Sequence, residues 1–222
     1  MKPKALPLFF ASLFFLNSAS AASFSWDITP GTVGSGDNII TGGAGTWNLS
    51  NGNWSSDAGA NNIIWGNTAA DEAIFGDAGG TVTIDTGLGI TANKLTFNST
   101  SYTISGNVAG DLLTLAGTTP TITVSSIGDT AAISAGVTGS AGITKSGAGV
   151  LTLPAALTYT GSTIVADGAL GVAAALPSST TPGLGSNLVL SGGVFSPGTS
   201  FTRSLGTAGN QVQIIGSGGF WA

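Results

Sequence analysis

The fold is decided by the stretch "ITKSGAGVLTLPAALTYTGSTIVADGALGV", residues 143–172, in which short apolar alternations are separated by turn residues. Successive side chains of a β-strand point to opposite faces, so Leu151 and Leu153 are expected to point into one core. Glycines fall between the strands, where a turn needs a positive φ or two segments of backbone approach closely. The stretch contains no His, Cys or Arg. It therefore predicts strands and tight turns without reactive groups.

The same alternation recurs from about Thr81, in pieces whose centres lie roughly eight to twelve residues apart. Val82 and Ile84 face one way, with Thr81 and Thr83 on the other face. Outward positions carry mostly Thr and Ser, which stack well on identical neighbours, whereas stacked like charges would repel. This favours an all-β, right-handed parallel β-solenoid, or β-helix. The alternative is a β-sandwich of similar strand content.

Composition supports many short strands and excludes several classes of site. The 222 residues include 36 Gly, and only 7% are charged, so long helices are not expected. The formal net charge of −5 argues against nucleic acid and anionic membranes as partners, because both need clustered basic residues. The absence of cysteine excludes disulfides and thiolate metal sites.

The first 21 residues predict a signal peptide. Lys2 and Lys4 form a basic start, residues 5–16 are an apolar run, and the small residues at 19–21 predict cleavage after Ala21. The apolar run is shorter than the roughly 20 residues that cross a bilayer as a helix. We therefore expect export, with no membrane span in the mature chain.

Residues 22–80 form a region rich in Trp, Asn, Gly and Asp. We favour the interpretation that its indoles cover the N-terminal end of the apolar stack, because large aromatic side chains are usually buried and a solenoid needs a cap. The alternative is a glycan-binding module in which exposed Trp47, Trp54 or Trp65 stacks on sugar rings.

Residues 143–172 resemble the autotransporter-associated β-strand repeat, also called the passenger-associated repeat, of bacterial surface and secreted proteins. The positions that fit this repeat are Lys145, Gly147, Gly149, Leu151, Leu153, Tyr159, Thr160, Gly161, Thr163, Gly168, Leu170 and Val172. Residues 154–156 depart from the usual Ser-Gly at the turn after Leu153. The segments 73–106 and 192–220 resemble the regions that flank such repeats. The resemblance implies a passenger-type β-helix displayed or released outside a Gram-negative cell, with turn and core residues rather than catalytic residues as the shared positions.

The acidic residues do not predict a catalytic or metal site. Most of the ten carboxylates stand beside Gly, Asn or Ala, as turn residues do. Asp71 and Glu72 are adjacent, and neighbours on a strand point to opposite faces, so they do not form an acid–base pair. The tandem glycine-rich nonapeptide of calcium-filled β-rolls is absent. We expect no enzyme, cofactor or metal; a polysaccharide-cleaving β-helix using an Asp cluster is the rival hypothesis.

The sequence thus predicts a signal peptide in residues 1–21, a Trp-rich capping or first-coil region in 22–80, and a β-solenoid in 81–222 that is incomplete at its C-terminus. The expected function is a non-catalytic scaffold for adhesion or cell-surface structure at the outer cell surface or outside the cell. The expected partners are an extracellular glycan or protein surface, and further copies of the chain through the solenoid ends.

Overall fold

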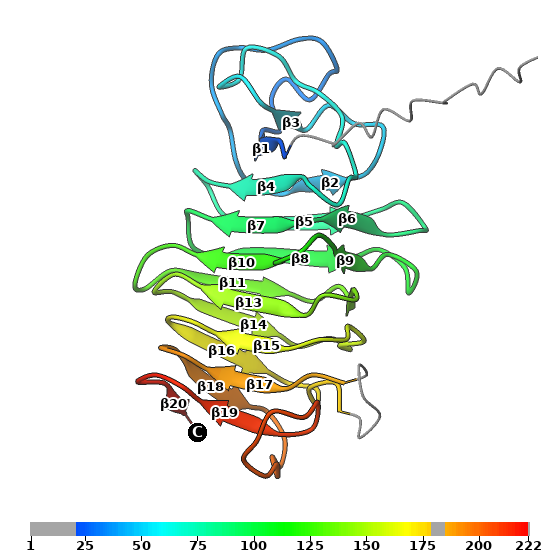
Figure 1. The fold of residues 1–222 in the computed structure, drawn as a ribbon. Coiled ribbons are helices and arrows are strands. Elements are labelled where there is room, and N and C mark those ends of the chain that lie inside the picture. Colours follow the sequence, from blue (N-terminus) through cyan, green and yellow to red (C-terminus); the bar gives the residue numbers. More distant parts are fainter. Residues whose placement is uncertain (1–20, 179–184, 222) are drawn as a thin grey trace, which may run out of the picture.

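The fold was analysed in a computed structural model, which describes residues 21–178 and 185–221. The expected signal peptide lies outside these residues except for Ala21. Strands and turns, and no helix, make up the described ranges. Figure 1 shows the strands stacked rung upon rung, from the blue N-terminal end to the red C-terminal end.

Three sheets run along the stack. The first sheet contains β1 (Ser23–Trp26), β3 (Trp54–Ser55), β4 (Glu72–Phe75), β7 (Lys94–Phe97), β10 (Thr121–Val124), β13 (Ile143–Ser146), β15 (Thr163–Val165), β17 (Leu188–Leu190) and β19 (Val212–Ile214). The second contains β2 (Gly45–Trp47), β5 (Thr81–Ile84), β8 (Tyr102–Gly106), β11 (Thr130–Ile133), β14 (Val150–Leu153), β16 (Ala169–Val172), β18 (Val194–Pro197) and β20 (Gly219–Phe220). The third contains β6 (Ile90–Ala92), β9 (Leu113–Leu115) and β12 (Val137–Thr138).

Every strand except β3 pairs in parallel with its counterpart one coil away. In the second sheet Leu151 of β14 lies in register with Ala131 of β11 on one side and with Leu170 of β16 on the other. The strands that follow each other along the chain, such as β13 and β14, belong to different sheets. This arrangement confirms the β-solenoid and excludes the β-sandwich, in which consecutive strands pair antiparallel.

The inward side of the coils forms one continuous apolar core. Leu151, Leu153 and Leu170 are fully buried in it, as the alternation predicts. Hydroxyl groups occupy the outward positions of neighbouring coils, where Thr123 and Ser146 are 2.8 Å apart. Stacking therefore places apolar side chains over apolar ones inside and hydroxyls over hydroxyls outside.

The Trp-rich region belongs to the same sheets as the coils that follow it. β2 pairs with β5, and β4 pairs with β7, so both sheets run across residue 80 without a break. At the N-terminal end β3 pairs antiparallel with β1, and loops from residues 22–70 lie over the first coil (Figure 1).

Tight packing at the corners leaves no room for a side chain at several glycines of the repeat, and Gly149 is an example. A Cβ atom on Gly149 would lie 2.5 Å from Val124 Cγ1 and 2.7 Å from the carbonyl oxygen of Asp129. The chain passes so close to the preceding coil that no side chain fits. By contrast, a Cβ on Gly76 would meet nothing within 4 Å.

Gly149→Ala is therefore expected to lower the free energy of unfolding by about 1–3 kcal/mol through overpacking. Gly76→Ala makes the same chemical change in free space and is expected to leave stability within about 1 kcal/mol of the parent, or to raise it. Urea unfolding followed by circular dichroism measures both. Equal effects of the two substitutions would contradict the close approach at Gly149.

Candidate functional site

The repeat 143–172 contributes β13 and β14 to one coil and β15 and β16 to the next, and many of its motif side chains lie inside the solenoid. Leu151, Leu153, Tyr159, Thr163, Leu170 and Val172 are all buried. Gly147, Gly161 and Gly168 have φ values of +74°, +82° and +59°, the left-handed region that favours glycine. The turn that contains Pro154 leads to Leu157, which bridges in parallel to Val137 of the preceding coil.

Lys145 is fully buried, although it is the most strongly hydrated kind of side chain in the repeat. It occupies an inward position of β13, in register with Ile122 and Val165. Its Nζ atom donates hydrogen bonds to the carbonyl oxygens of Ser146 at 2.8 Å, Gly147 at 2.6 Å and Asp167 at 3.2 Å. The ammonium therefore joins a corner of its own coil to the corner of the next.

The environment of Lys145 changes its acidity. Burial lowers its pKa from 10.5 to about 8, and the negative charge of Asp167 opposes part of this shift. Three carbonyl acceptors match the three N–H donors of the ammonium. The sequence identifies Lys145 as a motif position, and its spacing of two from the buried Ile143 is the signal that places it on the inward face.

A second buried polar group contains two further motif residues. The hydroxyl of Tyr159 lies 2.7 Å from Thr163 Oγ1, which also contacts the hydroxyl of Ser186 in the next coil. All three side chains are fully buried. Burial raises the pKa of Tyr159 to about 12, because ionisation would place a phenolate among apolar side chains. The Tyr-x-Gly-x-Thr piece thus places a hydrogen-bonded hydroxyl chain across two coils.

The tryptophans considered for sugar stacking lie in the aromatic cluster at the N-terminal end. Trp47, Trp54 and Trp65 are 0%, 1% and 2% exposed. The centroids of Trp54 and Trp65 are 4.7 Å apart, and those of Trp47 and Trp65 are 5.1 Å apart. None of the three has an indole face open to water in this structure. The sequence reasoning did not single out Trp221, whose side chain is 59% exposed.

The adjacent carboxylates Asp71 and Glu72 have different environments. Asp71 is buried and accepts a hydrogen bond from the backbone N–H of Thr68 at 3.0 Å. Glu72 points outward and accepts from the hydroxyls of Ser23 and Thr96. Among the residues that the structure describes, no group of three or more His, Cys, Asp or Glu side chains could hold a metal ion.

The C-terminal coil presents apolar side chains to solvent. Ile214, Ile215, Phe220 and Trp221 are each at least half exposed. The strands β19 and β20 are the last of their sheets, and Val212 of β19 bridges in parallel to Leu205 on the side away from β17. No helix long and apolar enough to cross a membrane occurs in the described ranges. This end therefore differs from the N-terminal end, where β3 and the aromatic cluster cover the first coil.

Replacement of Lys145 by Met tests the role of the ammonium. Lys145→Met is expected to lower the free energy of unfolding by about 1–3 kcal/mol, because three buried carbonyls lose their donor. Lys94 is exposed on β7, so Lys94→Met is the matched control and is expected to change stability by at most about 0.5 kcal/mol. Chemical denaturation of both variants gives the comparison. If Lys145→Met were as mild as its control, the carbonyl contacts would have no stabilising role.

Alkaline pH tests the buried hydroxyl chain. The folded pKa of Tyr159, about 12, lies above the ordinary value of 10.0, so its contribution to stability is complete below pH 10 and is lost as pH rises towards 12. Tyr159→Phe is expected to be less stable than the parent at neutral pH, and this difference is expected to shrink above pH 10. Unfolding curves across this range measure the difference. Tyr102 is present in both proteins, so its ionisation affects the stability of both equally. A difference in stability that stays constant with pH would contradict the raised pKa of Tyr159.

Comparisons with known proteins agree with this geometry. Residues 143–172 match the family described as passenger-associated-transport-repeat, which confirms the resemblance inferred from the sequence. The chain is also 39% identical over 221 residues to the adhesin BmaC autotransporter of Brucella suis biovar 1 (strain 1330). This similarity covers 97% of the chain but only 6% of the adhesin. No solved structure matches the chain.

The chain therefore carries a passenger-associated transport repeat within a β-solenoid, and nearly its whole length is similar to a short part of an autotransporter adhesin.

Proposed function

We propose that this protein is a non-catalytic, surface-displayed or secreted scaffold that mediates adhesion at the outer surface of a Gram-negative cell. The observation that carries the proposal is the outward face of the first sheet at β10 and β13, where hydroxyl-bearing side chains of neighbouring coils lie in register. In β10 and β13, Thr121 lies in register with Thr144, and Thr123 with Ser146. Such a face can make many weak contacts over a long surface, without a pocket.

The comparisons support the same conclusion. The relative from Brucella suis is named as an adhesin, and the matched repeat is a passenger-associated one. Since the chain spans about 6% of that relative, the relative's whole activity does not transfer to it directly. The shared part is a set of coils, so we assign this chain the mechanical role of extending and presenting a contact surface.

The contacts are proposed to be of two kinds. The outward faces of the sheets contact an extracellular glycan or protein surface. The C-terminal end, with exposed Ile214, Ile215 and Phe220, contacts another copy of the chain through these apolar side chains.

The two rival functions have less support from the geometry. Sugar stacking on Trp47, Trp54 or Trp65 would require indole faces that this structure buries in the core. Polysaccharide cleavage by an acid–base mechanism would require two carboxylates facing one substrate bond, and Asp71 and Glu72 diverge.

Adhesion can be measured with the protein displayed on a non-adherent bacterium. The double variant Thr121→Ala, Thr144→Ala removes methyl and hydroxyl groups from the long first sheet and is expected to reduce attachment to matrix-coated surfaces several-fold. The control is Thr91→Ala, Thr114→Ala, which makes the same change on the short third sheet, where these residues lie in register. Its attachment is expected to match that of the parent.

If bacteria that display the parent protein attach no better than bacteria without it, the proposed function is overturned. Equal losses in the two double variants would contradict the choice of the first sheet. The purified protein is also sized over a range of concentrations, because self-association would raise apparent attachment. A monomer at every concentration would remove the proposed contact between C-terminal ends.

A further inference from the structure

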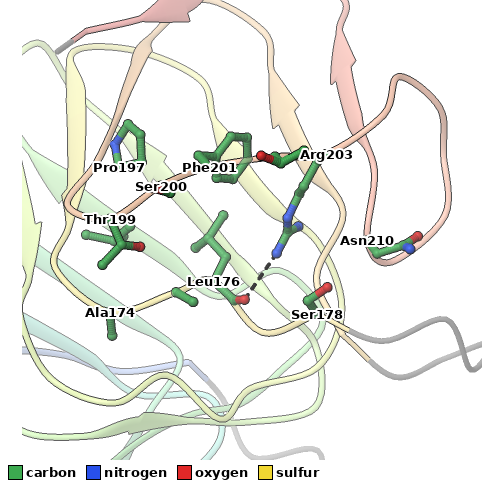
Figure 2. A pocket seen from close by; sticks show the side chains of 12 residues that line it. Ala174, Leu176, Ser178, Pro197, Thr199, Ser200, Phe201, Arg203 and Asn210 are labelled. Carbon is green, nitrogen blue, oxygen red and sulfur yellow. Dashed lines mark hydrogen bonds between the residues drawn. The ribbon is translucent and has the colours of Figure 1, made fainter.

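A cleft of about 240 Å³ lies on the C-terminal part of the solenoid, beside the segment that leaves β18. Figure 2 shows its walls, with the side chain of Arg203 reaching across it towards Leu176. The rim carries hydroxyl and amide groups from Ser178, Thr199, Ser200 and Asn210. The cleft is smaller than the roughly 300–1,000 Å³ of pockets for drug-sized ligands, so it suits one small residue of a larger molecule.

Hydrogen bonds to the backbone fix the guanidinium of Arg203 in this cleft. Its Nη2 atom donates to the carbonyl oxygens of Leu176 at 3.1 Å and Pro177 at 3.2 Å, and its Nη1 atom donates to that of Ser186. Phe201 supports the group from one side, with the guanidinium carbon 5.5 Å from the ring centroid. A guanidinium has five N–H donors, and Nε–H takes part in none of these contacts.

Arg203 also lacks a negatively charged partner in the cleft. Its pKa is lowered by burial, and the one charge interaction that opposes this comes from Tyr159, which is neutral at physiological pH. The residues that line the cleft include no Asp or Glu. A fixed cation with spare donors in a polar cleft favours an anion, and guanidinium binds carboxylates through strong charge-assisted hydrogen bonds.

We propose that the Arg203 cleft binds the carboxylate of a uronic acid residue in an acidic extracellular polysaccharide. The carboxylate accepts hydrogen bonds from Arg203. The sugar hydroxyls exchange hydrogen bonds with the rim formed by Thr199, Ser200 and Asn210. This inference rests on the proposed adhesive function for its choice of an extracellular ligand, and it gives that function a substrate class.

The surroundings favour a sugar over an acidic peptide or a free phosphate. A uronic acid ring presents several hydroxyls around its carboxylate, which matches a rim of short hydroxyl and amide side chains. A phosphate would concentrate its charge on Arg203, the single basic side chain that lines the cleft, without the cluster of basic groups that usually surrounds it. The net charge of −5 repels anionic ligands, so a single cleft binds a single sugar weakly. A polymer with repeated sugars binds more tightly, because it contacts the clefts of many copies of the protein at once.

The chain offers a direct probe, because Arg203 is its single arginine and gives one Nε–Hε signal in a nitrogen–proton correlation spectrum. Titration with galacturonate is expected to shift this signal saturably, whereas galactose at the same concentrations is not. Phosphate and N-acetylaspartate are expected to bind at least about tenfold more weakly than galacturonate. Asn210→Asp adds a negative charge at the rim, leaves the Arg203 contacts intact, and is expected to weaken galacturonate binding by about tenfold.

Asn51→Asp is the control, since it adds the same charge on an exposed loop and is expected to change affinity by less than about twofold. Absence of a saturable shift with galacturonate would overturn the proposal. Equal binding of phosphate or N-acetylaspartate would overturn the assignment to a sugar, and equal effects of the two Asp variants would place binding elsewhere. Attachment of displayed protein is scored separately, so that an empty cleft with intact adhesion refutes this inference alone.

Discussion

Parallel hydrogen bonding between one coil and the next is the constraint on which the whole structure depends. The N–H of Val194 donates to the carbonyl oxygen of Gly168 at 2.8 Å, and Leu151 lies in register with Leu170. A slip of one residue would turn every inward side chain outward. Each corner must therefore return the chain to the same register within a narrow space. Glycine occupies the corner at Gly149 because the preceding coil leaves no room for a Cβ atom.

The same constraint explains the polar groups inside an otherwise apolar core. Corners expose carbonyl oxygens that the sheets do not pair, and a buried carbonyl without a donor is costly. Lys145 supplies three donors to two successive corners, and the hydroxyls of Tyr159 and Thr163 link the next coil. A longer apolar side chain could fill these volumes but could not satisfy the carbonyls. The polar positions of the repeat therefore bind the coils together.

Much of this fold follows from the sequence, because strand alternation is a local property. The spacing of Leu151 and Leu153 predicts both their strand and their burial. The number of sheets does not follow, since it depends on where the corners fall over distances longer than the alternation. The roles of Lys145 and Arg203 also escaped the sequence, because each depends on carbonyl groups brought together by coils or loops distant along the chain. The spacing of Lys145 from Ile143 indicates an inward position, but not the carbonyl groups that its ammonium contacts.

Strands and loops have different roles in the proposed binding. The strands keep the core uniform, and the loops can carry groups that bind specifically. The stacked strands fix the positions of outward hydroxyls, such as those of Thr123 and Ser146, at the spacing of the sheet. Loops between strands are free of that register and can carry groups that a sheet face would not tolerate. Arg203 is one such group, since its guanidinium is held by loop carbonyls rather than by a stacked neighbour. The regular faces are thus suited to broad, weak contact, and chemical selectivity is more readily built where the chain leaves the stack.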